Sequence, residues 1–263
     1  MSKLIIAEKP SVAKSIASAL GASSRADGFY EGNGLLVSWC VGHLVSPMDA
    51  GGYDENFKKW RYDDLPILPE PFRYVLTPGK EGAFENLRAL MDRPDVDTIV
   101  NACDAGREGE LIFWLVYEMA GCHKPVLRLW ISSMEDSAIR EGFSDLRPSA
   151  DYEALYQSAL CRQKADWLVG INATRLFSIL YHKTLTAGRV QTPILKMLVD
   201  REAKISSFQK EKYHIVQIAA GGMEAASERM GNADDAKALK AACETAQAVC
   251  VSVTREKKTE QPP

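Results

Sequence analysis

The chain has 263 residues, enough for one large domain or two to three small ones, and its formal net charge of −3 excludes a globally basic nucleic-acid coat but not a local basic groove. Its six cysteines form no Cys-x-x-Cys pair and no apolar run approaches the roughly 18 residues of a membrane span, so we expect no zinc site, disulfide framework or membrane anchor. No signal peptide is recognisable, and we therefore expect a cytoplasmic protein.

The chain opens with a strand, a charged turn and a helix. Lys3–Ala7 is a short apolar run, Glu8 and Lys9 form the turn, and Val12–Leu20 is helical with a proline before it and a glycine after it. Taken alone, this segment favours a solvated turn for Glu8 and Lys9 over a ligand site.

The next segments predict a strand and then a long surface excursion. Gly34–Cys40 is strand-like, and His43 follows a glycine, where we expect it to satisfy a backbone group rather than contact a ligand. Residues Pro47–Pro78 are rich in proline, glycine and aromatics and show little periodicity, which indicates an ordered excursion. On it, Arg61 lies between two aromatic residues and offers a phosphate-binding point, while Gly79–Arg93 predicts a helix.

A second strand, turn and helix begins at Thr98. The β-branched run ends near Asp104, the turn contains Gly106, and an apolar helix follows. In parallel α/β sheets ligands bind beyond the carboxyl ends of the strands, where Asp104, Arg107 and Glu108 would lie. The alternative is a polar turn whose Glu108 and Glu110 favour the N-terminal dipole of the helix.

These two turns become informative together. If their strands are neighbours in one parallel sheet, Glu8, Asp104 and Glu108 meet at one edge together with the ammonium of Lys9. Such a cluster of carboxylates is costly unless a cation neutralises it. Mg²⁺ usually takes one or two carboxylates together with waters and phosphate oxygens, so the edge is a candidate magnesium site.

The order of elements predicts an α/β fold followed by an all-helical part. Pro125–Ile131 is a further strand and Ser132–Gly142 a capped helix, so residues 1–150 form a mostly parallel sheet with helices on both faces. Strand signals vanish from Asp151, and we assign residues 151–212 to a helical domain. Residues 213–263 begin a third, incomplete α/β segment, with strands at Tyr213–Ala220 and Ala248–Val253 and a helix at Asp234–Thr245.

The helical part contains a candidate phosphate site. Residues 184–193 form a loop that leads into a helix, which we expect over Ile194–Lys204, and small residues with free backbone amides stand beside Arg189 in this loop. Amides at a helix N-terminus bind anions such as a phosphodiester.

The motifs can now be read together. In chain order they are Ile-Ala-Glu8-Lys9-Pro-Ser, Gly-His43, Asp104-Ala-Gly-Arg107-Glu108-Gly-Glu110, Arg162-Gln-Lys-Ala-Asp166-Trp-Leu-Val-Gly170-Ile-Asn172-Ala-Thr-Arg175 and Ala-Gly188-Arg189-Val190-Gln191-Thr192-Pro. They closely resemble the amino-terminal part of type IA DNA topoisomerases, nearest to the topoisomerase III branch. The resemblance covers essentially the whole chain.

The resemblance implies a Toprim domain at 1–150, a helical single-stranded-DNA-binding domain at 151–212 and the start of the arch domain at 213–263. It implies an enzyme that relaxes negatively supercoiled DNA or decatenates DNA through transient single-strand cleavage, with Mg²⁺ and without ATP. Glu8 and Asp104, assisted by Glu108, would hold the metal, Lys9 would stabilise the phosphate or protonate the leaving 3′ oxygen, and Arg107 would clamp the backbone. The implied path of single-stranded DNA is lined by Arg61, Arg162, Asp166, Arg175, Gly188, Arg189, Val190, Gln191 and Thr192.

Two departures from the family pattern matter. Gly106 stands where many relatives have a second aspartate, which removes one potential metal ligand. None of the nine tyrosines has the Tyr-x-Arg-Thr context of the family's nucleophile, so we expect no catalytic tyrosine in this chain, and we expect Tyr181 to pack at a helix end. The alternatives are a Toprim-type Mg²⁺-dependent nuclease and a non-catalytic single-stranded-DNA-binding protein.

Overall fold

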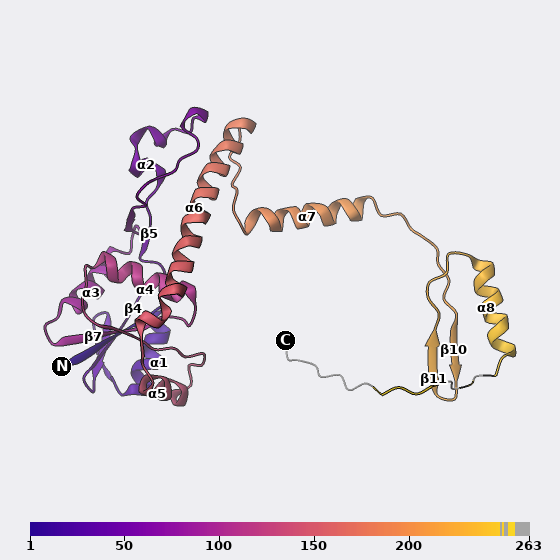
Figure 1. Ribbon diagram of the computed structural model, residues 1–263, viewed down its shortest axis with the longest axis horizontal. Helices are drawn as coiled ribbons and strands as arrows, with labels where there is room; N and C mark the ends of the chain where they lie inside the picture. Colours follow the sequence, from indigo (N-terminus) through magenta and orange to yellow (C-terminus); the bar gives the residue numbers. More distant parts are fainter. Residues whose placement is uncertain (248, 250–251, 256–263) are drawn as a thin grey trace. The chain divides into compact units, whose positions relative to one another are not determined.

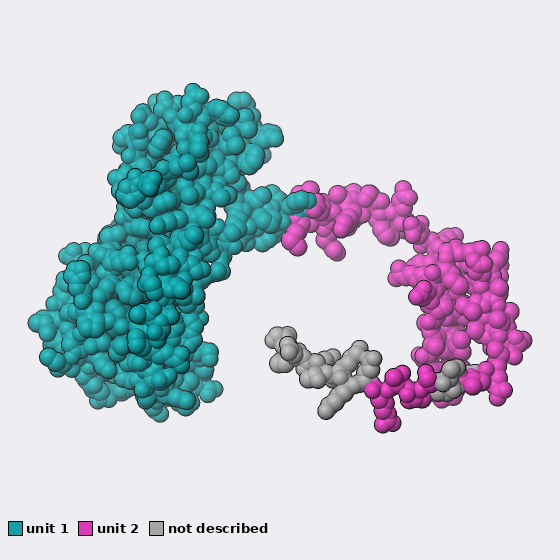
Figure 2. Space-filling model, in the orientation of Figure 1, with its two compact units in different colours: residues 1–196 teal, residues 197–263 magenta. Residues whose placement is uncertain are grey.

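The computed structural model describes residues 1–247, 249 and 252–255. The chain forms two compact units, Met1–Lys196 and the residues from Met197 onward, which are coloured separately in Figure 2. The domain limits expected at residues 150 and 212 stay predictions. Each unit is described by itself below.

A seven-stranded sheet organises the first unit, in the order β2-β3-β4-β1-β7-β8-β9. Its neighbours β4, β1, β7 and β8 run parallel to one another, whereas β2, β3 and β9 pair antiparallel at the two sides. The prediction of a mostly parallel sheet is therefore confirmed. The strands are β1 (Ser2–Ala7), β2 (Ser24–Ala26), β3 (Phe29–Gly32), β4 (Leu35–Trp39), β7 (Val96–Ala102), β8 (Val126–Arg128) and β9 (Arg147–Pro148).

Alternate residues of the central strands supply two hydrophobic cores, one on each face. Leu4 and Ile6 of β1 pack with helices α3 (Glu81–Asp92) and α4 (Arg107–Met119). Ile5, between them, points to the opposite face and packs with α1 (Pro10–Leu20) and α5 (Asp136–Ser144). Helices thus cover both faces of the sheet, as predicted, and the buried strands fix where each strand ends (Figure 1).

The excursion expected over Pro47–Pro78 is ordered and extends from the hairpin of β5 (Val45–Pro47) and β6 (Tyr74–Leu76). It contains α2 (Ala50–Tyr53) and the short 3-10 helices Glu55–Lys58 and Tyr62–Asp64. The side chain of Asn172 accepts from the backbone N–H of Ile67 at 2.6 Å and donates to its carbonyl at 3.0 Å. Because Asn172 belongs to α6 (Glu153–Tyr181), this pair of bonds ties the excursion to that helix.

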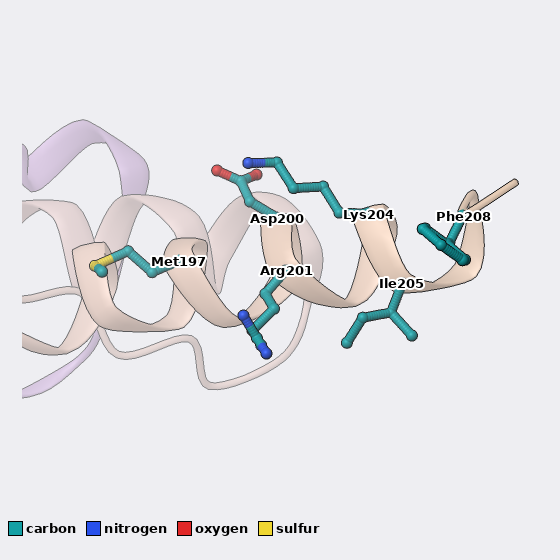
Figure 3. Close-up of a pocket in the computed structure, with 6 residues that line it drawn as sticks. All are labelled: Met197, Asp200, Arg201, Lys204, Ile205 and Phe208. Atoms are coloured by element: carbon teal, nitrogen blue, oxygen red, sulfur yellow. The ribbon is translucent and has the colours of Figure 1, made fainter. Parts of the chain in front are cut away.

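Helix α6 is 29 residues long, and its first half packs on α4 through Tyr156 and Ala159. Helix α7 (Gln191–Ser206) begins earlier than the predicted Ile194, because Pro193 is accommodated in its first turn. No residue of α7 is buried. Figure 3 shows the side chains along this helix that line an open hollow of about 650 Å³, namely Met197, Asp200, Arg201, Lys204, Ile205 and Phe208. Across the described residues, no helix is long and apolar enough to cross a membrane.

The second unit contains the antiparallel hairpin of β10 (Gln217–Ala220) and β11 (Met223–Ala226) and the helix α8 (Ala233–Thr245). The predicted helix at Asp234–Thr245 is confirmed, whereas the strand expected over Tyr213–Ala220 forms only in its last part. Of the strand expected over Ala248–Val253, residues 248, 250 and 251 lie outside the described residues. The capped helix expected from Ser132 begins instead at Asp136.

Candidate active site

The first two turns of the sequence analysis meet at one edge of the sheet. In the parallel register of β1 and β7, Ala7 lies opposite Ala102, so Glu8 and Asp104 leave the sheet at the same edge. The Nζ atom of Lys9 lies 3.1 Å from Glu8 Oε1 and 3.6 Å from Asp104 Oδ2. One ammonium therefore bridges two carboxylates, which confirms that these side chains meet; their chemical roles stay predictions.

We call Glu8, Lys9 and Asp104 the acid edge. The two carboxylates of this edge stabilise the positive charge of Lys9. The hydrogen bond to Glu8 raises the pKa of Lys9, and the charges of Glu8 and Asp104 raise it further. The Glu8 side chain is 11% exposed, whereas those of Lys9 and Asp104 are about half exposed. Lys9 consequently stays protonated and within reach of a ligand.

The third predicted carboxylate has a different neighbour. Glu108 lies in the first turn of α4, and its Oε2 atom is 3.8 Å from Nε2 of His43. The ring of His43, expected to serve a backbone group, instead faces this carboxylate. Among the residues that the structure describes, no group of three His, Cys, Asp or Glu side chains surrounds a common metal position. Of the three predicted metal ligands, Glu8 and Asp104 thus share the ammonium of Lys9, whereas Glu108 contacts His43.

The residues at the edge suit a magnesium ion by chemistry and by space. Two carboxylates are a sufficient protein contribution for Mg²⁺, whose remaining ligands are waters and phosphate oxygens. Gly106 stands at φ 172° and ψ 173°, an extended conformation that any residue adopts, and a Cβ added there would meet nothing within 4 Å. The missing aspartate is therefore not a requirement of the backbone.

A buried ion pair contacts the backbone of the acid edge from the core. Arg128 and Glu110 have fully buried side chains, and Arg128 Nε donates to Glu110 Oε1 at 2.5 Å. The guanidinium also donates to the carbonyls of Asn101, Cys103, Leu129 and Asp104. Burial raises the pKa of Glu110, while Arg128 and hydrogen bonds from neighbours that include Asn101 act against this rise. The network holds the turn after β7 from inside the protein.

Sequence analysis missed this network. The one role considered for Glu110 was to favour the dipole of the helix in a polar turn, but its side chain is fully buried. The available signal was a lone arginine between leucines in the β8 run, since a charge in a buried strand needs an opposite charge nearby.

Gly109 brings the start of α4 against the same turn. A Cβ at this position would lie 2.1 Å from the carbonyl oxygen of Asp104 and would clash with its backbone. Only glycine permits this close approach, so the position of Asp104 depends on Gly109 as well as on Arg128.

Arg162, Asp166 and Arg189 form a cluster with an excess of positive charge. Arg189 donates to Asp166 through Nε at 2.7 Å and Nη2 at 3.1 Å, and Arg162 Nε lies 3.9 Å from the same carboxylate. The pKa of Arg189 is raised mainly by Asp166, and the charge of Glu108 adds to this effect. The carboxylate predicted to assist the metal therefore acts electrostatically on an arginine of the predicted DNA path.

The loop before α7 exposes the rest of this path. Thr192 accepts a hydrogen bond from the backbone N–H of Gly188 at 3.0 Å, and Val190 and Gln191 are exposed. The predicted anion site at this helix start is therefore open to solvent.

Two predicted DNA contacts lie elsewhere. The side chain of Arg175 is buried beneath the excursion, with its Cζ 5.5 Å from the ring centre of Trp60. Its Nε and Nη1 atoms have no hydrogen-bond partner in the part of the chain that the structure describes, and burial lowers its pKa. Arg61 is exposed and donates to Asp64 at 3.0 Å. Arg175 is thus not on the surface of the path, and contact of either residue with DNA stays a prediction.

The sequence of this chain matches two known protein-family models. Residues 3–134 match the model described as Toprim domain, and residues 150–263 match the model described as DNA topoisomerase. The chain belongs to the type IA DNA topoisomerases. Its similarity to curated relatives points to the topoisomerase III branch: it is 46% identical to DNA topoisomerase 3 of Bacillus subtilis over 224 residues, 85% of this chain and 31% of that protein.

Two further proteins are similar to this chain. It is 42% identical to DNA topoisomerase 3 of Staphylococcus aureus, over 85% of this chain and 32% of the relative. The solved structure of full-length topoisomerase I from Thermotoga maritima matches with a TM-score of 0.61 and 25% identity, covering 90% of this chain and 37% of that one. This chain therefore spans about a third of the length of these relatives. Toprim domains, the family that residues 3–134 match, generally bind divalent metal.

Tyr181 differs from its expected setting. It is the last residue of α6, before the left-handed His182, and it is 68% exposed. The expectation that it packs at the helix end is wrong, because the helix terminates in solvent.

Proposed function

We propose that this chain supplies the metal-dependent cleavage site and the single-strand groove of a type IA topoisomerase. The whole enzyme would relax negatively supercoiled DNA or decatenate DNA by cutting one strand, passing another through the break and resealing it. The observation that carries the proposal is the bridge of Lys9 between Glu8 and Asp104 at the ends of two neighbouring parallel strands.

The residues of the edge have distinct roles in this proposal. Glu8, Asp104 and Glu108 would hold Mg²⁺, which supplies positive charge against phosphate oxygens. Lys9, kept protonated by its carboxylate neighbours, stabilises the phosphate or gives its proton to the leaving 3′ oxygen. Arg107, exposed on the first turn of α4, clamps the DNA backbone.

The proposed partner is single-stranded DNA. Its backbone would follow exposed cations from the Arg162, Asp166 and Arg189 cluster toward the acid edge, which reconciles DNA binding with a negative net charge. The contacts proposed are Arg61, Arg162, Asp166, Gly188, Arg189, Val190, Gln191 and Thr192; Arg175 is left out because its side chain is buried. The reaction would need no ATP, and a cytoplasmic location stays a prediction.

Calorimetric titration with Mg²⁺ tests the metal site directly. Asp104→Asn keeps the size of the side chain but removes its charge, and we expect it to weaken Mg²⁺ binding about tenfold or more. Asp27→Asn, at an exposed position in the turn between β2 and β3, is the matched control and should bind as the parent does. Equal affinity of the Asp104→Asn protein and the parent would refute the proposed site.

A further inference from the structure

An aromatic pair lies beside the acid edge on the next strand of the sheet. β8 runs parallel to β7, and Trp130 follows shortly after its end at Arg128. The guanidinium of Arg128 donates to the carbonyl of Asp104 at 2.8 Å, and its Cζ lies 5.0 Å from the ring centre of Trp130. The same buried group therefore contacts both the acid edge and the indole.

The pair combines a flat apolar surface with access to solvent. Trp130 and Tyr152 stack with ring centres 4.8 Å apart and an angle of 19° between the rings. Trp130 is 37% exposed, although a ring of this size between two packed elements is usually mostly buried. Packing explains the buried side of the indole, which meets Arg128, but leaves its exposed part without a role.

A cation stands at the outer end of the pair. Arg147 lies in β9, opposite Arg128 in the antiparallel register, and its side chain is 55% exposed. Its Nη2 atom lies 3.4 Å from Asp145 Oδ2, and Tyr152 and Asp145 both raise the pKa of the guanidinium. An exposed aromatic surface flanked by an exposed cation is the combination that binds single-stranded nucleic acid, in which bases stack and phosphates pair.

We propose that the Trp130–Tyr152 pair is a stacking subsite for one nucleobase of single-stranded DNA beside the acid edge, with Arg147 meeting the backbone phosphate. The inference rests on the proposed function, because it assumes that the phosphate to be cut lies at Glu8, Lys9 and Asp104. Neighbouring strands are about 4.8 Å apart, so a base at the end of β8 belongs to a nucleotide next to that phosphate or close to it. Duplex DNA cannot use this subsite, because its bases are already stacked.

Fluorescence anisotropy with two oligonucleotides separates base stacking from phosphate binding. One is single-stranded oligo-dT, and the other is an abasic strand of equal length that carries only sugars and phosphates. We expect Trp130→Ala to weaken oligo-dT binding about fivefold or more and to leave abasic binding unchanged, since stacking on an aromatic residue contributes at this level. Trp130→Phe should retain most of the affinity for oligo-dT because it keeps an aromatic face.

Tyr30→Ala is the matched control, because Tyr30 also pairs with a tryptophan, Trp39. These two residues lie in β3 and β4, which β1 and β7 separate from β8 in the strand order of the sheet. It should bind both strands as the parent does. If the parent binds no single-stranded DNA, the proposed function itself fails. If the parent binds, and Trp130→Ala loses nothing or loses equally on both strands, only the stacking subsite is refuted.

Photo-crosslinking tests the subsite without any variant. Oligonucleotides with 5-iododeoxyuridine at successive positions are irradiated with the parent protein, and the linked peptides are identified by mass spectrometry. We expect one position to link to Trp130 or Tyr152. Links that form only elsewhere, for example at the exposed Trp60, would overturn the assignment even if Trp130→Ala fails to fold.

Discussion

The acid edge and the cluster of Arg162, Asp166 and Arg189 are held in different ways. Glu8 and Asp104 follow strands that are buried on both faces, and the carbonyl of Asp104 is bonded to a guanidinium with no exposed surface. In the cluster, Arg189 and Asp166 hold each other, and both side chains are more than a third exposed. The edge is positioned by the core, whereas the cluster is positioned by its own ion pairs.

This difference suits the two proposed tasks. A site that must present carboxylates and an ammonium to one phosphate benefits from preorganised groups. A site that meets a strand of variable sequence benefits from arginines whose present partner can be exchanged for a phosphate at little cost, because exposed ion pairs contribute about 0 to 1 kcal/mol. Changes in the scaffold of the edge should therefore affect stability, and changes in the cluster should affect only binding.

The largest effect is expected from breaking the buried pair. Arg128→Met leaves the buried carboxyl of Glu110 without its counter-charge and removes the donor to the Asp104 carbonyl. We expect a loss of about 3–5 kcal/mol in the free energy of unfolding, measured by urea denaturation. Adding Glu110→Gln removes the unpaired charge, so the double variant should regain part of this loss.

The control for this variant is Arg88→Met, which breaks the exposed pair of Arg88 with Glu85. A surface pair of this kind contributes at most about 1 kcal/mol. Similar losses in Arg128→Met and Arg88→Met would show that the edge is not supported by the core.

The next effect concerns the metal. Gly106→Asp restores a carboxylate in an extended backbone position with free space around its Cβ, so the turn should accept it. We expect Mg²⁺ to bind on the order of tenfold more tightly in calorimetric titration, because one more carboxylate faces the ion. Gly106→Asn has the same size without the charge and should change little; equal gains in both variants would attribute the effect to the backbone instead.

The sequence predicted those parts of the fold that consist of a strand, a turn and a helix consecutive in the chain. The units of β1 with α1 and β7 with α4 each combine an apolar run, a turn and an amphipathic helix, and their pairing follows from the rules for parallel sheets. The strands β2, β3, β5, β6 and β9 were missed because runs of two to four residues are too short to show a period. The start of α5 was misplaced because Ser133 accepts from the N–H of Glu135 in a turn before the helix instead of capping it.

The site was predictable only where a residue type reveals its chemistry. Glu8, Lys9 and Asp104 stand next to strands, and their meeting followed once the strands were placed side by side. The Arg128–Glu110 pair joins residues 18 apart in sequence through a packed core, and a lone charge in the sequence does not identify its partner. The resemblance placed Arg175 on the DNA path, and the sequence does not show that the excursion covers that part of α6.

A smaller effect is expected in the cluster. Arg189→Ala should leave stability unchanged and reduce the slope of log affinity against log salt for single-stranded DNA by about 0.7, the value for one phosphate contact on a single strand. Fluorescence anisotropy at several salt concentrations measures it. Arg88→Ala, which removes an exposed arginine on α3, should keep the parent slope. An unchanged slope and affinity in Arg189→Ala would mean that Arg189 serves only to bind Asp166.

The smallest effect, none at all, is expected from Tyr181→Phe. Cleavage in this family is nucleophilic catalysis by a tyrosine, and Lys9, Arg107 and Mg²⁺ only assist an attacking oxygen. Tyr181 is exposed and follows the part of α6 that carries Asp166, so it has the access that a nucleophile needs. However, its hydroxyl makes no hydrogen bond among the described residues, and its sequence context is not that of the family's nucleophile. We therefore expect no covalent link between this chain and DNA.

The measurement uses end-labelled single-stranded oligonucleotide with Mg²⁺, followed by denaturation and electrophoresis. The parent and Tyr181→Phe should both bind the strand and both lack a protein-linked label. A linked band in the parent that disappears in Tyr181→Phe would show that this chain carries its own nucleophile. Cut strands without a linked band would instead favour a metal-dependent nuclease built on the same acid edge, since water would then be the attacking group.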